Sequence, residues 1–223
     1  MNYYYIIGII AFIITTLAQI FVSVNYNKYK NVLNKNKMSG YDTAKKILDN
    51  NGLSSLYIVE TKGYLTDHYD PSAKVIRLST DNYHGETIAG AAIAAHEAGH
   101  AIQHKEGNLL IKLRKFIFPI VNFSTKAGYY IILFGFIFGI LKLVYLGIAL
   151  LSFIVLFQLI TLPVEIDASK KALNNIKKLN ILDKDELNGA SKVLRAAAFT
   201  YVAGLASAIL EVFRLILMAK DND

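Results

Sequence analysis

Residues 87–101 read TIAGAAIAAHEAGHA, an uncharged run of small and apolar residues that leads into the pattern His-Glu-x-x-His. On a helix, side chains four residues apart lie on one face, so His96 and His100 can bind the same metal ion. Glu97 projects about 100° away, where it can reach a metal-bound water but is poorly placed as a further ligand. The pattern therefore predicts a zinc site in which Glu97 is the general base.

The same pattern also occurs by chance on solvated helices. Here the residues before it carry no charge, which indicates a buried helix. Buried polar side chains need partners, and a metal ion is a suitable one. We expect this helix over residues 86–104, ending near Gly107. His104 lies a further turn along, about 5–6 Å away. Bonds from zinc to nitrogen are about 2.0–2.1 Å long, so we do not expect His104 to be a ligand.

The composition favours a membrane protein. Of the 223 residues, 54% are hydrophobic and none is cysteine, so metal ligands must be His, Asp or Glu. The net charge is +7. A nucleic-acid site would need basic residues interleaved with aromatic ones along a groove. The lysines instead cluster beside apolar runs, which indicates a lipid bilayer and not nucleic acid as a partner.

Four apolar segments are long enough to span a bilayer. Residues 3–24 are almost uncharged. The alternative, a signal peptide, lacks its usual basic start here and would have a shorter apolar core. Residues 117–141 and 143–163 predict a tight hairpin with Lys142 at its turn. Residues 195–218 predict a fourth span, the alternative being a helix packed against the others.

Basic residues predict the orientation. Four lysines follow the first apolar run directly, whereas only the amino terminus precedes it. The positive-inside rule then places the residues after this run in the cytoplasm. These lysines are Lys28, Lys30, Lys35 and Lys37.

The residues between the first span and the metal helix predict a small mixed region. A helix is expected over 39–52, and short strands over 56–60 and 74–79. Residues 63–71, between the strands, are polar and rich in turn formers. They belong either to a β-hairpin whose edge pairs with an extended substrate, or to a loop whose side chains satisfy local backbone groups. Candidates for stabilising an oxyanion are Tyr69, His68 and His84.

The third zinc ligand is expected where the hairpin returns to the side of the two histidines. Catalytic zinc sites usually have three protein ligands and one open position. Glu165 is the first candidate. Pro163 can open a new helical turn or kink the existing helix, and Glu165 is expected to begin another helix. Asp167 is the alternative, and it points about 200° from Glu165, so the two cannot readily share one ion. Both could instead favour a helix N-terminus electrostatically.

Four segments in this order resemble the YugP-like neutral zinc metallopeptidases. The resemblance implies an integral membrane peptidase with one zinc ion per chain, related to the HtpX-like and Ste24-like proteases. In those, two histidines and a later Glu bind zinc, which implies Glu165 as the third ligand, with Ala168 matching the Ala three positions later. The next position, usually Asp, is Ser169 here, and Asp167 is the candidate for its role of holding a zinc-bound histidine. The segments are Gly63 with residues 65–71, then 77–79, 94–103 and 162–169.

We therefore predict a mainly α membrane protein with about four transmembrane helices and a small α+β, zincin-like catalytic region made of the His-Glu-x-x-His helix and a β-hairpin. The expected parts are an N-terminal transmembrane helix, the catalytic region, a transmembrane hairpin, and the third-ligand helix with a C-terminal apolar helix. Their ranges are 1–27, 28–115, 116–164 and 165–223.

The predicted function is zinc-dependent endopeptidase activity on peptides or proteins, including membrane proteins. His96, His100 and Glu165 would bind the metal. Two alternatives stay open: a membrane scaffold or adaptor that keeps the site without turnover, and a zinc hydrolase of non-peptide amides or esters. The oligomeric state is left open by the sequence.

Overall fold

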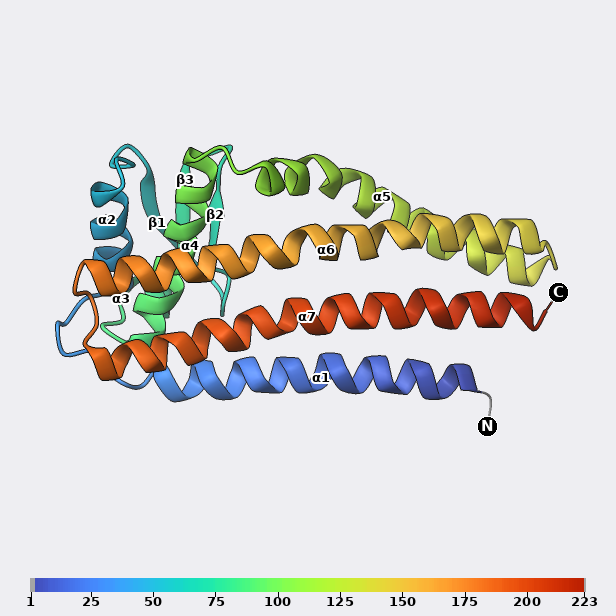
Figure 1. Ribbon diagram of the computed structural model, residues 1–223, viewed down its shortest axis with the longest axis horizontal. Coiled ribbons are helices and arrows are strands. Elements are labelled where there is room, and N and C mark those ends of the chain that lie inside the picture. Colours follow the sequence, from blue (N-terminus) through green and yellow to red (C-terminus); the bar gives the residue numbers. More distant parts are fainter. Residues whose placement is uncertain (1–2, 223) are drawn as a thin grey trace. The chain divides into compact units, whose positions relative to one another are not determined.

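The computed structural model describes residues 3–222. Within that range the chain is mainly helical, with one three-stranded sheet (Figure 1). It divides into two compact units. The helical unit comprises residues up to Gln19, 109–163 and from Phe199 on; the α+β unit comprises 20–108 and 164–198. The elements are α1 (Tyr3–Tyr29), α2 (Gly40–Asn50), β1 (Tyr57–Thr61), β2 (His68–Asp70), β3 (Val75–Ser79), α3 (Thr80–His84), α4 (Ile88–Lys105), α5 (Leu109–Ile137), α6 (Leu141–Lys178) and α7 (Lys184–Lys220).

The helical unit is built from helix α5 and from parts of α1, α6 and α7. Each is long and apolar enough to cross a membrane. Large hydrophobic side chains, among them Phe12, Phe123 and Phe213, stand on their surfaces. So many exposed apolar side chains on one group of helices need an apolar environment, and lipid provides it. The chain is therefore a mainly α membrane protein, as the sequence predicted.

The hairpin of α5 and α6 is packed closely because small residues face one another. A Cβ added at Gly147 would lie 2.8 Å from the carbonyl oxygen of Gly128. Such small residues let membrane helices approach one another. The turn between the helices contains Gly139, whose φ of +66° favours glycine. The prediction of a turn at Lys142 is wrong by about one helical turn, since that residue lies at the start of α6.

Helix α6 is longer than expected. It continues without a break through Pro163, so the prediction that a new helix begins at Glu165 is wrong. Proline removes a backbone donor, yet membrane helices tolerate it where other groups satisfy the freed carbonyl. Glu165 therefore lies inside a continuous helix.

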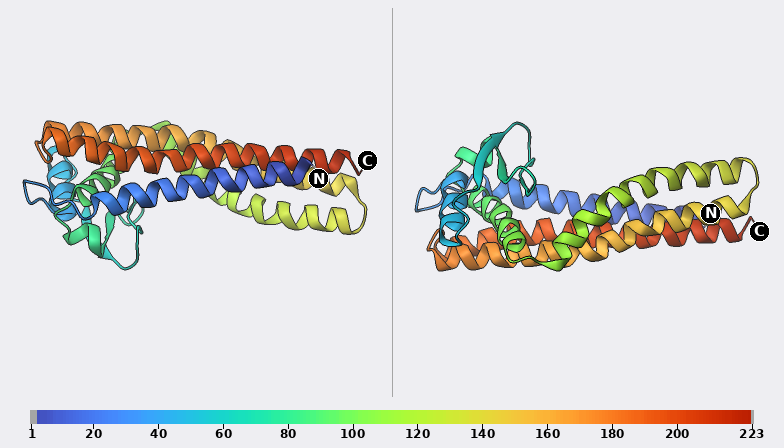
Figure 2. Two further views of the ribbon diagram at one scale, coloured as in Figure 1. Left: turned by 90° about the horizontal axis from the view of Figure 1, so that it is seen from below. Right: turned by 90° about the horizontal axis from the view of Figure 1, so that it is seen from above.

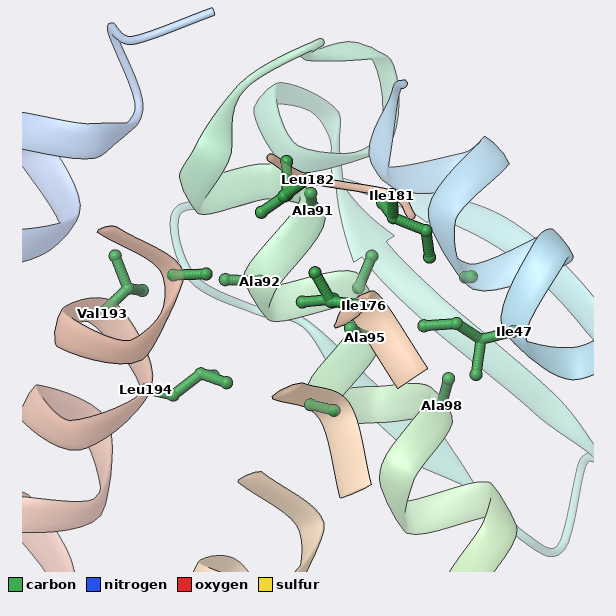
Figure 3. Packing of buried hydrophobic residues seen from close by; sticks show 14 of the residues in the cluster. Ile47, Ala91, Ala92, Ala95, Ala98, Ile176, Ile181, Leu182, Val193 and Leu194 are labelled. Carbon is green, nitrogen blue, oxygen red and sulfur yellow. The ribbon is translucent and has the colours of Figure 1, made fainter. Parts of the chain in front are cut away.

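In the α+β unit, helix α4 is the central element. Thr87 caps it by accepting a hydrogen bond from the backbone N–H of Gly90 at 3.0 Å. Most of its residues are buried, and its alanines pack against neighbours on several sides. Figure 3 shows Ala91, Ala92 and Ala95 among larger aliphatic side chains from other elements. The small residues let these elements approach α4, which explains why the run before the histidines is rich in alanine.

The sheet has the order β1-β3-β2, with β3 at its centre. Strand β1 runs parallel to β3, whereas β2 runs antiparallel to it. The two expected strands are present within a residue or so, but they are not the two arms of one hairpin. The polar segment between them supplies β2, and β2 forms the hairpin with β3. The buried strand β3 takes the centre because Val75, Ile76 and Leu78 are its apolar residues, and β2 is left at the edge. Figure 2 shows the ribbon from two further directions.

Candidate metal centre

Three side chains converge between α4 and α6 within the α+β unit. His96 and His100 come from α4, and Glu165 comes from α6. The Glu165 Oε2 atom lies 3.2 Å from His96 Nε2 and 3.5 Å from His100 Nε2. The side chains are 14%, 11% and 3% exposed, respectively. The structure thus brings the two histidines to Glu165.

The donor atoms fit a zinc ion. One donor atom from each residue lies within 4.8 Å of the others. Bonds of about 2.0–2.1 Å in a tetrahedral arrangement place neighbouring ligand atoms about 3.3–3.4 Å apart. The distances from Glu165 Oε2 to the two imidazole nitrogens agree with that spacing. Two imidazoles and a carboxylate also form a common donor set of catalytic zinc.

Glu97 lies next to the first histidine and is buried, with 7% of its surface exposed. Its negative charge acts on His100. Burial disfavours the charged imidazolium of His100, but the hydrogen bond that His100 donates to Glu165 and the charges of both carboxylates outweigh this effect, so the pKa of His100 lies above its usual value. Protons and a metal ion therefore compete for this imidazole.

Gln103 supports His100 on the Nδ1 side of its imidazole ring. The Nδ1 atom of His100 lies 3.0 Å from Oε1 of Gln103, which is fully buried. The amide nitrogen of Gln103 donates to the backbone oxygen of Val164 at 2.8 Å and to Oδ2 of Asp167 at 2.7 Å. Asp167 thus reaches His100 through Gln103 and not directly.

His96 has a different supporting contact. Its Nδ1 atom lies 3.3 Å from the hydroxyl oxygen of Ser169, which is buried. The residue that departs from the Asp of the HtpX-like pattern therefore still contacts a histidine. The expectation that Asp167 takes over this role is met only indirectly and at the other histidine.

The crossing of α4 and α6 is very close. A Cβ added at Gly99 would lie 2.6 Å from the carbonyl oxygen of Ala168. Gly99 lies between the two histidines, and Ala168 lies one turn beyond Glu165. Only a glycine fits at this position, so it allows the approach that brings the three side chains together.

The other candidates have partners of their own. The hydroxyl of Tyr69, on β2, lies 3.0 Å from Nδ1 of His104, which is exposed and one turn beyond His100. His68 contacts the backbone oxygen of Thr66 at 2.8 Å. His84 lies 3.2 Å from Glu60 and is largely exposed. The group of possible metal ligands in the described residues includes none of these histidines.

Comparison with known proteins identifies the family. The profile of the family described as "Putative neutral zinc metallopeptidase" matches residues 4–220. The chain belongs to this family. The chain is similar to the "Putative membrane protease YugP" of Bacillus subtilis (strain 168). The two are 43% identical over 201 residues, which cover 90% of this chain and 89% of that protein. No solved structure matches the chain. The resemblance inferred from the four sequence segments is thereby confirmed.

Sequence reasoning missed Gln103 as a part of the site. In the sequence it is only the last residue of segment 94–103, one of the four segments that resemble the family. Its spacing was a usable signal, because a residue three positions after His100 lies on nearly the same helix face. A polar side chain next to an apolar run needs buried partners.

Proposed function

We propose that this member of the neutral zinc metallopeptidase family is an integral membrane, zinc-dependent endopeptidase. The observation that carries the proposal is the zinc-like spacing of Glu165 Oε2 from the imidazole nitrogens of His96 and His100, on three side chains that are each at most 14% exposed, beside the buried carboxylate of Glu97. One zinc ion per chain would bind there.

Each residue of the site would have its own role in the hydrolysis of a peptide bond. Bound zinc would supply a water of lowered pKa and polarise the scissile carbonyl. Glu97 would accept a proton from the attacking water and then donate it to the amine that leaves. His96, His100 and Glu165 would hold the metal, and their burial would limit the access of bulk water to the reaction.

We propose a peptide or protein, including membrane proteins, as the substrate. Strand β2 is at the edge of the sheet, and α4 packs against it. An edge strand can hydrogen-bond to an extended peptide, which would then lie along the metal helix. Tyr69 is on this strand and contacts His104 on α4, so it is close to the path that such a peptide would take.

We further propose that the four apolar helices cross the bilayer and that the metal centre is on the cytoplasmic side. The lysines after α1 and those at the end of α6 support this orientation by the positive-inside rule. Cysteines introduced at Lys35 and Lys142 would report it. If a reagent that stays outside the cell labelled the cysteine at position 35 and not the one at position 142, the orientation would be the reverse of the one proposed.

The proposal is tested first by zinc content. Detergent-solubilised wild type is expected to hold about one zinc ion per chain, and Glu165→Ala is expected to lose it because two histidines remain. Zinc retained by Glu165→Ala would contradict the ligand set. A folded wild type that takes up no zinc even when it is supplied would favour the scaffold.

Cleavage of a peptide library tests the chemistry. Glu97→Gln is expected to keep zinc and lose cleavage, because an amide cannot accept the proton of water. Glu106→Gln is the matched control: this residue ends α4 and forms an exposed ion pair with Lys171, which contributes little. An active Glu97→Gln enzyme would refute the mechanism.

A further inference from the structure

We propose that Gln103 and Asp167 form a positioning relay that fixes the tautomer of His100 and holds the two metal-bearing helices together. This inference rests on the proposed function, because it takes His96, His100 and Glu165 as the zinc ligands. It concerns residues that do not touch the metal.

The relay begins with the orientation of one amide. The Nε2 atom of Gln103 lies 2.8 Å from the oxygen of Val164 and 2.7 Å from Oδ2 of Asp167. Both partners are acceptors, and only the NH₂ group of an amide carries two donors. The opposite orientation would place the amide oxygen against two oxygens. The amide oxygen of Gln103 therefore faces His100.

The orientation of the amide decides the proton of the imidazole. Because Gln103 Oε1 is an acceptor, Nδ1 of His100, 3.0 Å away, must carry the hydrogen. The neutral ring then has its free lone pair on Nε2, which is the atom that faces Glu165. Gln103 thus prepares His100 as a metal ligand without contacting the metal.

The same amide ties α4 to α6 at the ligands. Val164, whose carbonyl accepts from Gln103, directly precedes Glu165, and Asp167 follows it by two residues. Gln103 is fully buried, so water cannot easily replace these bonds. The relay therefore sets the position of Glu165 relative to His100 as well as the tautomer.

The decisive measurement is zinc affinity, by competition with a chelating dye, on full-length protein in detergent. Gln103→Met keeps the size of the side chain but removes both donors and the acceptor. We expect zinc binding 10- to 100-fold weaker, the usual loss when a supporting contact of a ligand is removed. The absorption spectrum of the Co²⁺-loaded variant should also change, because the ligand geometry changes. The melting temperature of the metal-free variant reports folding.

Gln158→Met is the matched control. It makes the same exchange on α6, seven residues before Glu165, or about 10 Å along the helix. It is expected to leave zinc affinity and the Co²⁺ spectrum unchanged. An equal loss of affinity in both variants would overturn the relay, because general loosening of α6 would then explain the effect.

A charge exchange tests the contact between the two relay residues. Gln103→Glu places a carboxylate against Asp167 and Val164, so zinc affinity should fall by at least tenfold. Adding Asp167→Asn supplies an amide donor opposite the new carboxylate and should recover part of the affinity. These changes preserve side-chain size, so they decide the question even if Gln103→Met does not fold. Wild-type affinity in Gln103→Glu, or no recovery in the double variant, would overturn the relay.

The outcomes separate this inference from the proposed function. Wild type that binds zinc but cleaves no peptide would refute the endopeptidase and leave the relay supported by the affinities. Wild type that binds zinc no more tightly than its Gln103 variants would refute the relay alone. Wild type that binds no zinc would refute both.

Discussion

Replacing Gly99 by alanine should damage the metal centre although alanine is the better helix former. The added Cβ would lie 2.6 Å from the carbonyl oxygen of Ala168 and 3.2 Å from its carbonyl carbon. Ordinary contacts begin at 3.4 Å, so the helices must separate by about 0.8 Å. The Cβ is bonded directly to the backbone, and the two atoms of Ala168 are backbone atoms, so no side-chain rotation can relieve the contact.

The separation acts directly on the proposed ligands. Gly99 lies between His96 and His100 on α4, and Ala168 follows Glu165 by one turn of α6. Metal sites tolerate deviations of about 0.2 Å in ligand distances. A separation of about four times that value should weaken zinc binding by at least tenfold. Overpacking of this kind also costs about 1–3 kcal/mol, which exceeds the 0.5–1 kcal/mol that alanine contributes to a helix.

The assay compares zinc affinity and melting temperature in detergent. Gly8→Ala is the matched control, because Gly8 is inside α1 and an added Cβ would meet only the Arg214 side chain, at 3.6 Å. This variant should bind zinc as wild type does. If Gly99→Ala binds zinc with wild-type affinity and melts at a higher temperature, the close helix crossing does not set the site and the reasoning is refuted.

Three further predictions concern other parts of the chain. Asp67→Asn should lower the free energy of unfolding by about 1.5–3 kcal/mol, because the Asp67 carboxylate accepts from Ser79 and Asn82; an unchanged melting curve would contradict this. Glu211→Leu should destabilise the helical unit by about 2–3 kcal/mol, since Arg214 loses its partner in an apolar helix, and adding Arg214→Met should restore the melting temperature. Zinc affinity should decrease as the pH is lowered, and the decrease should begin above the usual pKa of histidine because the pKa of His100 is raised. Titrations from about pH 8 to 5 that show tighter binding in acid would refute this prediction.

The presence of most of the long helices could be predicted because their signals are local. The alanine-rich run predicts α4 and its burial, and Ser39 marks the start of α2, where it forms a capping box with Asp42. The end of α5 and the start of α6 could be predicted less well. Apolar residues continue through the turn, and the positive φ of Gly139 is a property of the folded chain.

The candidate for a third metal ligand could be narrowed to two residues, but spacing in the sequence alone does not choose between them. Glu165 and Asp167 point in different directions around α6, and only the packing of α6 on α4 decides which faces the histidines. That packing depends on Gly99 meeting Ala168, a contact between residues far apart in the chain. The position of Glu165 at the end of the hairpin made it the first candidate, and the resemblance to the family strengthened that choice.

The order of the strands was also beyond local reasoning. Residues 56–60 and 74–79 suit a parallel or an antiparallel pair equally well. The pairing is fixed by long-range contacts such as that of Asp67, which accepts from the backbone N–H of Ser79 at 2.8 Å and so draws the segment before β2 toward the end of β3. The short helix α3 was missed because it has five residues and no periodic pattern.

The placement of the candidate ligands on α4 and α6 has a consequence for the synthesis of the protein. Residues 101–164, which contain all of α5 and the apolar half of α6, are translated between His100 and Glu165. A nascent chain therefore carries an incomplete set of donors until these membrane-seeking segments have emerged. The order of translation thus delays completion of the candidate metal centre until the long apolar segments of α5 and α6 have been made, so the three donors meet only after these segments can enter a bilayer.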